Sequence, residues 1–114
     1  MVGKKSRTKG AAFERETAQL ISTYWPAAKR NLDQYQTSDG RDLGGTEPIC
    51  MQLKRRKNTM LWEIKMAYVE ARESTSLDYP YPMAVWRDDG DETYCMMKLE
   101  HLVEWLCLIE DGLL

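Results

Sequence analysis

The sequence predicts a single α/β (α+β) domain whose elements follow the order α-β-β-β-α-β-β-α. Three observations lead to this fold class. The chain has 114 residues, which is enough for one hydrophobic core and too few for two. Apolar residues recur with helical spacing in three segments, and short apolar or alternating runs of strand length lie between them. Glycine and proline residues separate these segments, as turns require.

The composition is that of a soluble globular protein, with 43% hydrophobic and 30% charged residues. No apolar run approaches the roughly 20 residues that span a bilayer, and the basic N-terminus lacks the apolar stretch of a secretory signal. Three widely spaced cysteines and one histidine argue against a disulfide framework and against a tetrahedral zinc site. We therefore expect an intracellular, cytoplasmic protein that does not associate with a membrane.

The N-terminal half is expected to hold one helix and three strands. Residues 1–9 are polar and basic without periodicity, which predicts a flexible arm before a folded domain of residues 10–114. A helix is expected from Gly10 until Pro26 stops it, and its buried stripe would be Phe13, Thr17, Leu20, Ile21 and Tyr24. Glu14, about 100° round the helix from Phe13, would lie at the border of that stripe.

The three strands of this half are predicted from shorter patterns. A short strand is expected around residues 29–33, and a second over residues 41–43. A tight turn at Gly44-Gly45 would join the second to a hairpin partner over residues 49–54.

The C-terminal half is expected to hold two helices around two strands. A helix over residues 60–73 would be capped by Asn58 or Thr59 and would share one face among Leu61, Ile64, Tyr68 and Ala71. The turn "DDGD" joins strands expected at residues 83–87 and 93–97. The last helix would start near Leu99, with Leu102, Val103, Leu106 and Ile109 facing inward.

The stretch "GRDLGGTEPICMQLKRRK", residues 40–57, contains the candidate site. If the hairpin forms, Asp42 lies near the strand that carries Gln52 and Lys54, whose side chains leave the same face. The Asp42 carboxylate, the Gln52 amide oxygen and the Leu53 carbonyl are hard oxygen ligands that suit Mg²⁺. A metal there could activate a water against a phosphodiester, and Lys54 could orient that water or stabilise charge on the phosphorus. A solvated polar face on an edge strand is the alternative interpretation.

The charge is divided unevenly along the chain, although the formal net charge is only −2. Residues 1–57 carry twelve Lys and Arg against six Asp and Glu, and residues 58–114 carry four against twelve. Such a domain can present one basic face to phosphates, or its basic residues can be scattered and solvated. The candidate DNA-binding residues are Lys4, Lys5, Arg7, Lys9, Arg15, Arg30, Arg55, Arg56 and Lys57.

Three motifs occur in the order found in PD-(D/E)XK nucleases: "KGAAFERE" on the first helix, then Asp42, then "MQLK" on a strand. More narrowly, the chain resembles archaeal-type Holliday junction resolvases and small phage-encoded nucleases of that group, by motif from residue 9 to about residue 57. The resemblance implies a restriction-endonuclease-like core, with a central mixed sheet flanked by helices. It also implies a Mg²⁺-dependent endonuclease that cuts branched DNA as a homodimer, with Mn²⁺ able to substitute. A phage or prophage source would fit.

By this resemblance Glu14, Asp42, Gln52 and Lys54 are catalytic, and Glu14, Asp42, Gln52 and Leu53 hold the metal, with Glu14 acting through a bridging water. The family usually has glutamate where this chain has Gln52. Glutamine keeps a carbonyl oxygen but removes a negative charge, which should weaken metal binding, and Glu47 could supply an acid instead. A non-catalytic DNA-binding module with this fold and a small α/β interaction protein remain alternatives.

Overall fold

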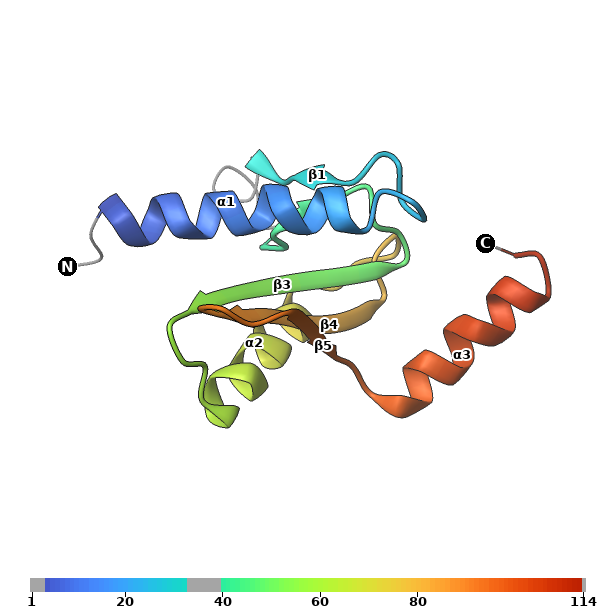
Figure 1. Cartoon of the computed structure of the whole chain (residues 1–114). Coiled ribbons are helices and arrows are strands. Elements are labelled where there is room, and N and C mark those ends of the chain that lie inside the picture. Colours follow the sequence, from blue (N-terminus) through green and yellow to red (C-terminus); the bar gives the residue numbers. More distant parts are fainter. Residues whose placement is uncertain (1–3, 33–39, 114) are drawn as a thin grey trace.

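The computed structural model of the chain describes residues 4–32 and 40–113, with side chains from residue 8 onward. Its elements confirm the predicted order α-β-β-β-α-β-β-α of an α+β fold (Figure 1). In chain order they are α1 (Lys4–Leu20), β1 (Lys29–Arg30), β2 (Leu43–Gly44), β3 (Ile49–Arg56), α2 (Leu61–Glu73), β4 (Tyr81–Asp88), β5 (Thr93–Met96) and α3 (Leu99–Glu110).

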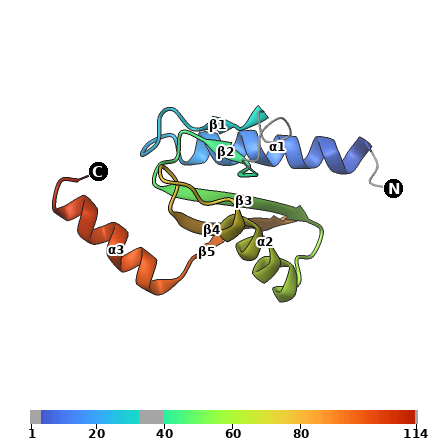
Figure 2. The ribbon, with the colours of Figure 1, turned by 180° about the vertical axis from the view of Figure 1, so that it is seen from behind.

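The main sheet is mixed and has three strands, with β4 in the middle. β4 runs parallel to β3 and antiparallel to β5. A parallel pair needs a crossover connection, and α2 supplies it between β3 and β4. β1 and β2 form a separate antiparallel pair. α1 covers one face of the main sheet and α2 packs on the other (Figures 1 and 2).

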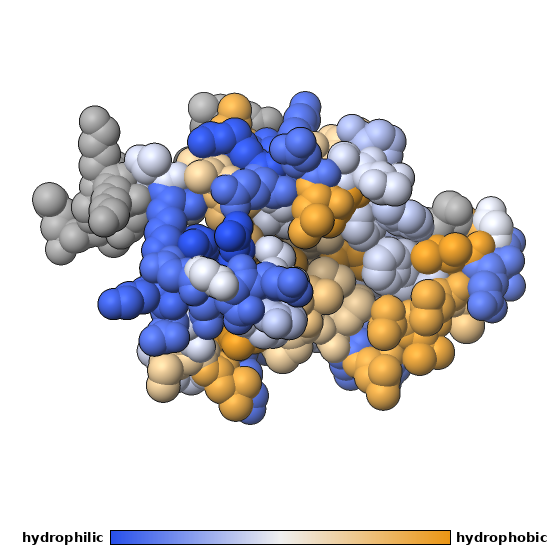
Figure 3. Space-filling view, in the orientation of Figure 1, coloured by the Kyte–Doolittle hydropathy of each residue, from blue (hydrophilic) through white to orange (hydrophobic). Residues whose placement is uncertain are grey.

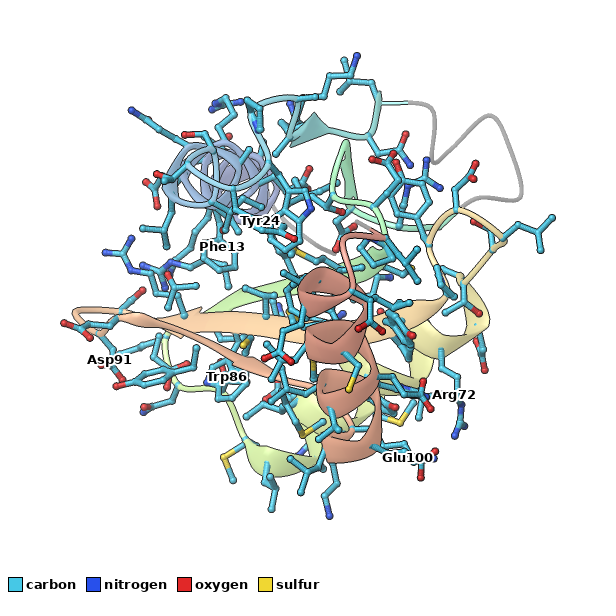
Figure 4. The ribbon with its side chains drawn as sticks, turned by 90° about the vertical axis from the view of Figure 1, so that its right-hand side faces the viewer. Phe13, Tyr24, Arg72, Trp86, Asp91 and Glu100 are labelled. Atoms are coloured by element: carbon cyan, nitrogen blue, oxygen red, sulfur yellow. The ribbon has the colours of Figure 1, made fainter. Side chains whose placement is uncertain are left out.

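Two apolar clusters lie on opposite faces of this sheet, and their residues alternate along each strand. Phe13 points from α1 towards the strands (Figure 4) and is 2% exposed. The cluster under α1 consists of Phe13, Ala18, Leu43, Ile49, Met51, Met83 and Val85. The smaller cluster under α2 consists of Ile64, Ala67 and Ala84. The predicted alternation of β3 is therefore confirmed: Met51 faces α1, whereas Cys50 and Gln52 contact residues of α2.

The first helix begins at Lys4, so the prediction of an arm over residues 1–9 is wrong for residues 4–9; residues 1–3 lie outside the described part. Lysine and arginine are good helix formers, and one glycine costs a helix only about 1 kcal/mol. The helix therefore continues through Gly10. It ends at Leu20, earlier than Pro26, so Leu20 and Tyr24 are 66% and 50% exposed instead of buried.

The predicted two-residue hairpin turn at Gly44-Gly45 does not form. β2 pairs with β1, with Leu43 opposite Arg30, and residues 45–48 make a longer connection to β3. The Asp42 N–H nevertheless donates to the Met51 carbonyl at 3.2 Å, so the aspartate lies beside β3 as expected. The first predicted strand, residues 29–33, is shortened to Lys29–Arg30, and residue 33 lies outside the described part.

Gly45 is required at the start of this connection, because its φ is 76° and a Cβ there would lie 2.3 Å from the Ala27 carbonyl oxygen. We expect Gly45→Ala to lower the free energy of unfolding by at least about 2 kcal/mol. Urea denaturation would measure the loss. Gly44→Ala is the matched control, since no described non-neighbouring atom lies within 4 Å of a Cβ built at Gly44. Equal stabilities for the two variants would contradict this account.

The start of α2 differs from the prediction. The N-cap is Met60, whose N–H donates to Glu63 Oε1 at 3.3 Å, and neither Asn58 nor Thr59 takes that position. The Thr59 N–H and hydroxyl both donate to Asp88 Oδ1 instead. Thr59 therefore does not cap α2, and its side chain instead joins the start of α2 to the end of β4.

The inward face predicted for α3 is not found. None of the α3 residues, all of which the structure describes, is buried, and Val103 and Leu106 are 52% and 48% exposed. The helix extends beyond the sheet, and apolar residues gather on its surface (Figures 1 and 3). Its anchor is Trp105, whose ring stacks on Trp25 with centroids 5.6 Å apart. The periodicity correctly gave the helix an apolar face, but periodicity does not determine what covers that face.

No helix in the described ranges combines the length and the apolar character needed to cross a membrane.

Candidate functional site

Asp42 is held against β3 by two hydrogen bonds. Its own N–H donates to the Met51 carbonyl, and its Oδ2 accepts from the Leu53 N–H at 2.7 Å. Leu53 lies between Gln52 and Lys54 in the chain. These two hydrogen bonds therefore bring Asp42 to the segment with which the sequence had associated it, although no tight hairpin turn connects them.

Gln52 and Lys54 leave the α2 face of β3 and meet Glu70 of α2. The Gln52 Nε2 donates to Glu70 Oε2 at 3.4 Å, and the Lys54 ammonium lies 3.3 Å from the same oxygen. Gln52 is only 9% exposed, and its Oε1 accepts no hydrogen bond from any residue that the structure describes. The amide is thus satisfied at its nitrogen and unsatisfied at its oxygen, which is unusual for a buried polar group.

Glu14 is not a solvated helical glutamate. Its side chain is 15% exposed, and its Oε2 accepts from Arg30 Nε at 3.1 Å, which ties α1 to β1. Its charge acts on Asp42 and raises the pKa of that carboxyl. The border position that the helical spacing gave Glu14 therefore places it where it influences the candidate site.

The Asp42 carboxyl is strongly perturbed. Burial is the main cause, and together with the charges of Glu14 and Glu70 it raises the pKa of Asp42 from 3.8 to about 7. The hydrogen bond from Leu53 and the charge of Lys54 act in the opposite direction but are smaller. A buried carboxylate near two other acids is a site where a bound cation would relieve an unfavourable charge.

The donor set can be tested for its fit to a hard divalent cation. Within the described residues, no three His, Cys, Asp or Glu side chains group closely enough to hold a metal ion. The site instead offers the Asp42 carboxylate, bound to the Leu53 N–H, and the unpartnered amide oxygen of Gln52, the residue before Leu53. Mg²⁺ commonly takes only one or two carboxylates and keeps several waters. The residues therefore fit Mg²⁺ better than a metal that needs a complete protein cage.

Most of the predicted phosphate-binding residues whose side chains the structure describes are paired with acids. Lys9 and Arg55 both contact Asp89 Oδ1, at 2.7 and 2.6 Å, and Arg56 Nε lies 2.9 Å from Glu63 Oε2. Figure 3 shows hydrophilic residues gathered over the first half of α1 and the adjoining tip of the sheet. This region is therefore a mixture of both charges.

The other basic candidates differ in what the structure says of them. The side chains of Arg15 and Lys57 are exposed, and Arg30 is paired with Glu14. Lys4, Lys5 and Arg7 belong to α1, but their side chains lie outside the described part.

Lys54 and Glu70 also line an open groove of about 250 Å³ beside the site. Trp62, which is 65% exposed, and the basic Arg56 contribute to the same groove. The face of β3 that carries Lys54 is therefore open to a ligand of moderate size.

Sequence reasoning missed Glu70 and left Glu47 open as a substitute acid. The Glu47 carboxylate accepts a hydrogen bond from the Tyr79 hydroxyl, which holds it at the connection before β3. No sequence motif around Glu70 marks it as a site residue. The signal for it is its position on α2 next to the buried Ala67 and Ala71, at the border of the face that packs on β3.

No protein family model matches this chain, and no curated protein or solved structure is significantly similar to it.

Proposed function

We propose that the protein is a divalent-cation-dependent endonuclease of the PD-(D/E)XK type, which hydrolyses phosphodiester bonds in DNA. The observation that carries the proposal is the buried, unpartnered Oε1 of Gln52. Gln52 lies on β3, the strand that also carries Lys54 and whose Leu53 N–H binds the Asp42 carboxylate. An unpartnered amide oxygen and a carboxylate are both ligands that a hard cation takes. A lysine on the same face adds a positive group beside a reacting phosphate.

The cation would be Mg²⁺, replaceable by Mn²⁺, held by Asp42, Gln52 and the Leu53 carbonyl, with Glu14 contributing through a water. When bound, such a cation polarises the phosphodiester and lowers the pKa of a coordinated water. The Leu53 N–H fixes the Asp42 carboxylate against β3. The Lys54 ammonium would orient the attacking water or stabilise the charge that develops on the phosphate.

The arrangement of elements supports a restriction-endonuclease-like core, because α1 and α2 cover opposite faces of a mixed sheet whose first strand carries the site. We propose branched DNA, such as a Holliday junction, as the substrate. A homodimer would supply two sites related by a two-fold axis for two symmetric cuts. Phosphate contacts would come from the candidate basic residues, of which Arg15, Arg56 and Lys57 are exposed.

The decisive experiment incubates the purified protein with a four-way junction and with a linear duplex, in Mg²⁺, in Mn²⁺ and in a chelator. We expect metal-dependent cleavage that favours the junction. Asp42→Asn and Lys54→Ala should each lower the cleavage rate by about 10²–10³-fold while junction binding survives. The matched controls are Asp78→Asn and Lys65→Ala, which alter exposed residues that line no part of the site. Absence of product from both DNAs in both metals would contradict the proposal.

A non-catalytic DNA-binding module with the same fold is the second candidate. The observation that favours it is that Arg30 already pairs with Glu14 and Lys54 already pairs with Glu70. These pairs reduce the negative charge that would attract a cation. This alternative predicts salt-sensitive DNA binding without cleavage in either metal.

A further inference from the structure

A glutamine at a cation site must be oriented, whereas a carboxylate need not be. Either oxygen of a carboxylate can face the cation, but an amide has one oxygen and one NH₂ group, which repels a cation. Gln52 therefore serves as a ligand only if its surroundings fix which end of the amide faces the site.

The structure contains a group that does this. A carboxylate only accepts hydrogen bonds, so Glu70 Oε2, 3.4 Å from Gln52 Nε2, selects the NH₂ end of the amide. The same oxygen lies 3.3 Å from the Lys54 ammonium. One carboxylate oxygen on α2 thus holds the two consecutive polar side chains that leave this face of β3.

A second observation is independent of Glu70. Gln52 is 9% exposed, and its Oε1 has no donor within the described ranges. A buried carbonyl oxygen without a partner costs about 1–3 kcal/mol. The orientation that satisfies Nε2 therefore leaves an oxygen that a cation would complete.

Glu70 is also well placed for a fixed contact. Ala67 and Ala71, its neighbours on α2, are 1% and 0% exposed, and the Cys50 thiol donates to the Ala71 carbonyl at 3.4 Å. The turn of α2 that carries Glu70 is thus packed directly on β3, so the core sets the backbone position from which the Glu70 side chain reaches Gln52 and Lys54.

We infer that Glu70 is a positioning residue: it orients the Gln52 amide so that Oε1 serves as a cation ligand, and it holds Lys54 beside that ligand. The inference rests on the cation site of the proposed function. It explains how a neutral residue can stand at position 52 of such a site.

The test is a double-mutant cycle read by Mn²⁺ affinity alone, measured by isothermal titration calorimetry without DNA. The four proteins are the wild type, Glu70→Gln, Gln52→Glu and the double variant. Glu70→Gln should weaken Mn²⁺ binding about 10-fold or more, because a glutamine at position 70 no longer selects one end of the Gln52 amide. In the Gln52→Glu background the same change should cost clearly less, since a carboxylate at position 52 has no polarity to fix and only the charge of Glu70 near Asp42 is lost.

Two further variants separate position from charge and from general damage. Glu70→Asp keeps the charge but withdraws the oxygen from Gln52, and we expect a loss similar to that of Glu70→Gln. Glu73→Gln removes an exposed acid one turn away on α2 and should leave Mn²⁺ affinity unchanged. The Glu70 side chain is 42% exposed, so these substitutions should fold, and thermal melting would verify it.

The outcomes are distinguishable. An unchanged Mn²⁺ affinity in Glu70→Gln, or an equal loss in both backgrounds, overturns the positioning role while the cation site stands. A wild-type protein that binds no Mn²⁺ overturns the proposed cation site together with this inference. A wild type that binds Mn²⁺ in the expected pattern but cuts no DNA supports the inference and contradicts only the nuclease activity.

Discussion

Asp42→Asn should make the protein more stable at neutral and alkaline pH, and the gain should disappear in acid. The Asp42 pKa is 3.8 when the carboxyl is unperturbed and about 7 in the folded chain, where burial disfavours the charged form. Between these two values the folded state holds a proton that the unfolded state has lost. Stability therefore falls as the pH rises through this window, by up to about 1.4 kcal/mol per pH unit.

Below pH 3.8 the carboxyl is neutral in both the folded and the unfolded state, and Asp42 then has no such effect on the free energy of unfolding. Above about pH 7 the full loss of stability is present. Asparagine keeps an acceptor for the Leu53 N–H and cannot ionise. We expect a gain on the order of 2–4 kcal/mol at pH 8, because a residue that is not fully buried is partly screened by water.

Urea denaturation of both proteins between pH 3.5 and 8, with ~0.5-unit steps, would measure the difference. Asp78→Asn, in an exposed loop, is the control for loss of a carboxylate. If Asp42 belongs to a cation site, Mg²⁺ should stabilise the wild type above pH 7 and leave Asp42→Asn unchanged. A stability difference that does not vary with pH would contradict the raised pKa of Asp42.

Phe13→Ala is expected to lower the free energy of unfolding by about 3–5 kcal/mol. Phe13 is 2% exposed and is the largest fully buried side chain among the residues that the structure describes, so its removal opens a cavity between α1 and the strands. The neighbouring Glu14 depends on the same helix for its place near Asp42. Phe13→Ala should therefore lower the thermal stability and should also loosen the place of Glu14 near Asp42.

Leu106→Ala on α3 is the matched comparison, since Leu106 is 48% exposed. We expect it to change the free energy of unfolding by less than about 1 kcal/mol. Chemical denaturation of the two variants would compare them directly. A larger loss from Leu106→Ala than from Phe13→Ala would mean that α3, and not α1, covers the core.

The local patterns predicted the order of elements because period and turn chemistry are properties of neighbouring residues. The two-residue period placed Gln52 and Lys54 on one face of β3, and the helical period placed Glu14 at the border of the buried stripe. Both follow from backbone geometry alone. The convergence of Asp42 with β3 could also be predicted, since only a short connection separates them.

Apart from the two ends of α1, which were misplaced along the chain, the failures concern contacts between distant segments. The pairing of β2 with β1, the engagement of Thr59 by Asp88 and the exposure of α3 depend on which elements meet, and no local signal reports this. Glu70 was missed for the same reason: it reaches Gln52 across eighteen positions of sequence. Its charge can be recognised as part of the site only when α2 is placed on β3.

The stacked indoles of Trp25 and Trp105 give the molecule an optical property of its own. Their planes differ by 14°, and their centroids lie 5.6 Å apart. At this separation the electronic transitions of the two indoles couple, so separating the rings should change the circular dichroism of the protein in the ultraviolet. The pair joins the turn after α1 to α3, and neither tryptophan is a candidate catalytic residue. Its signal therefore reports whether α3 is packed against that turn, independently of cation or DNA binding at Asp42.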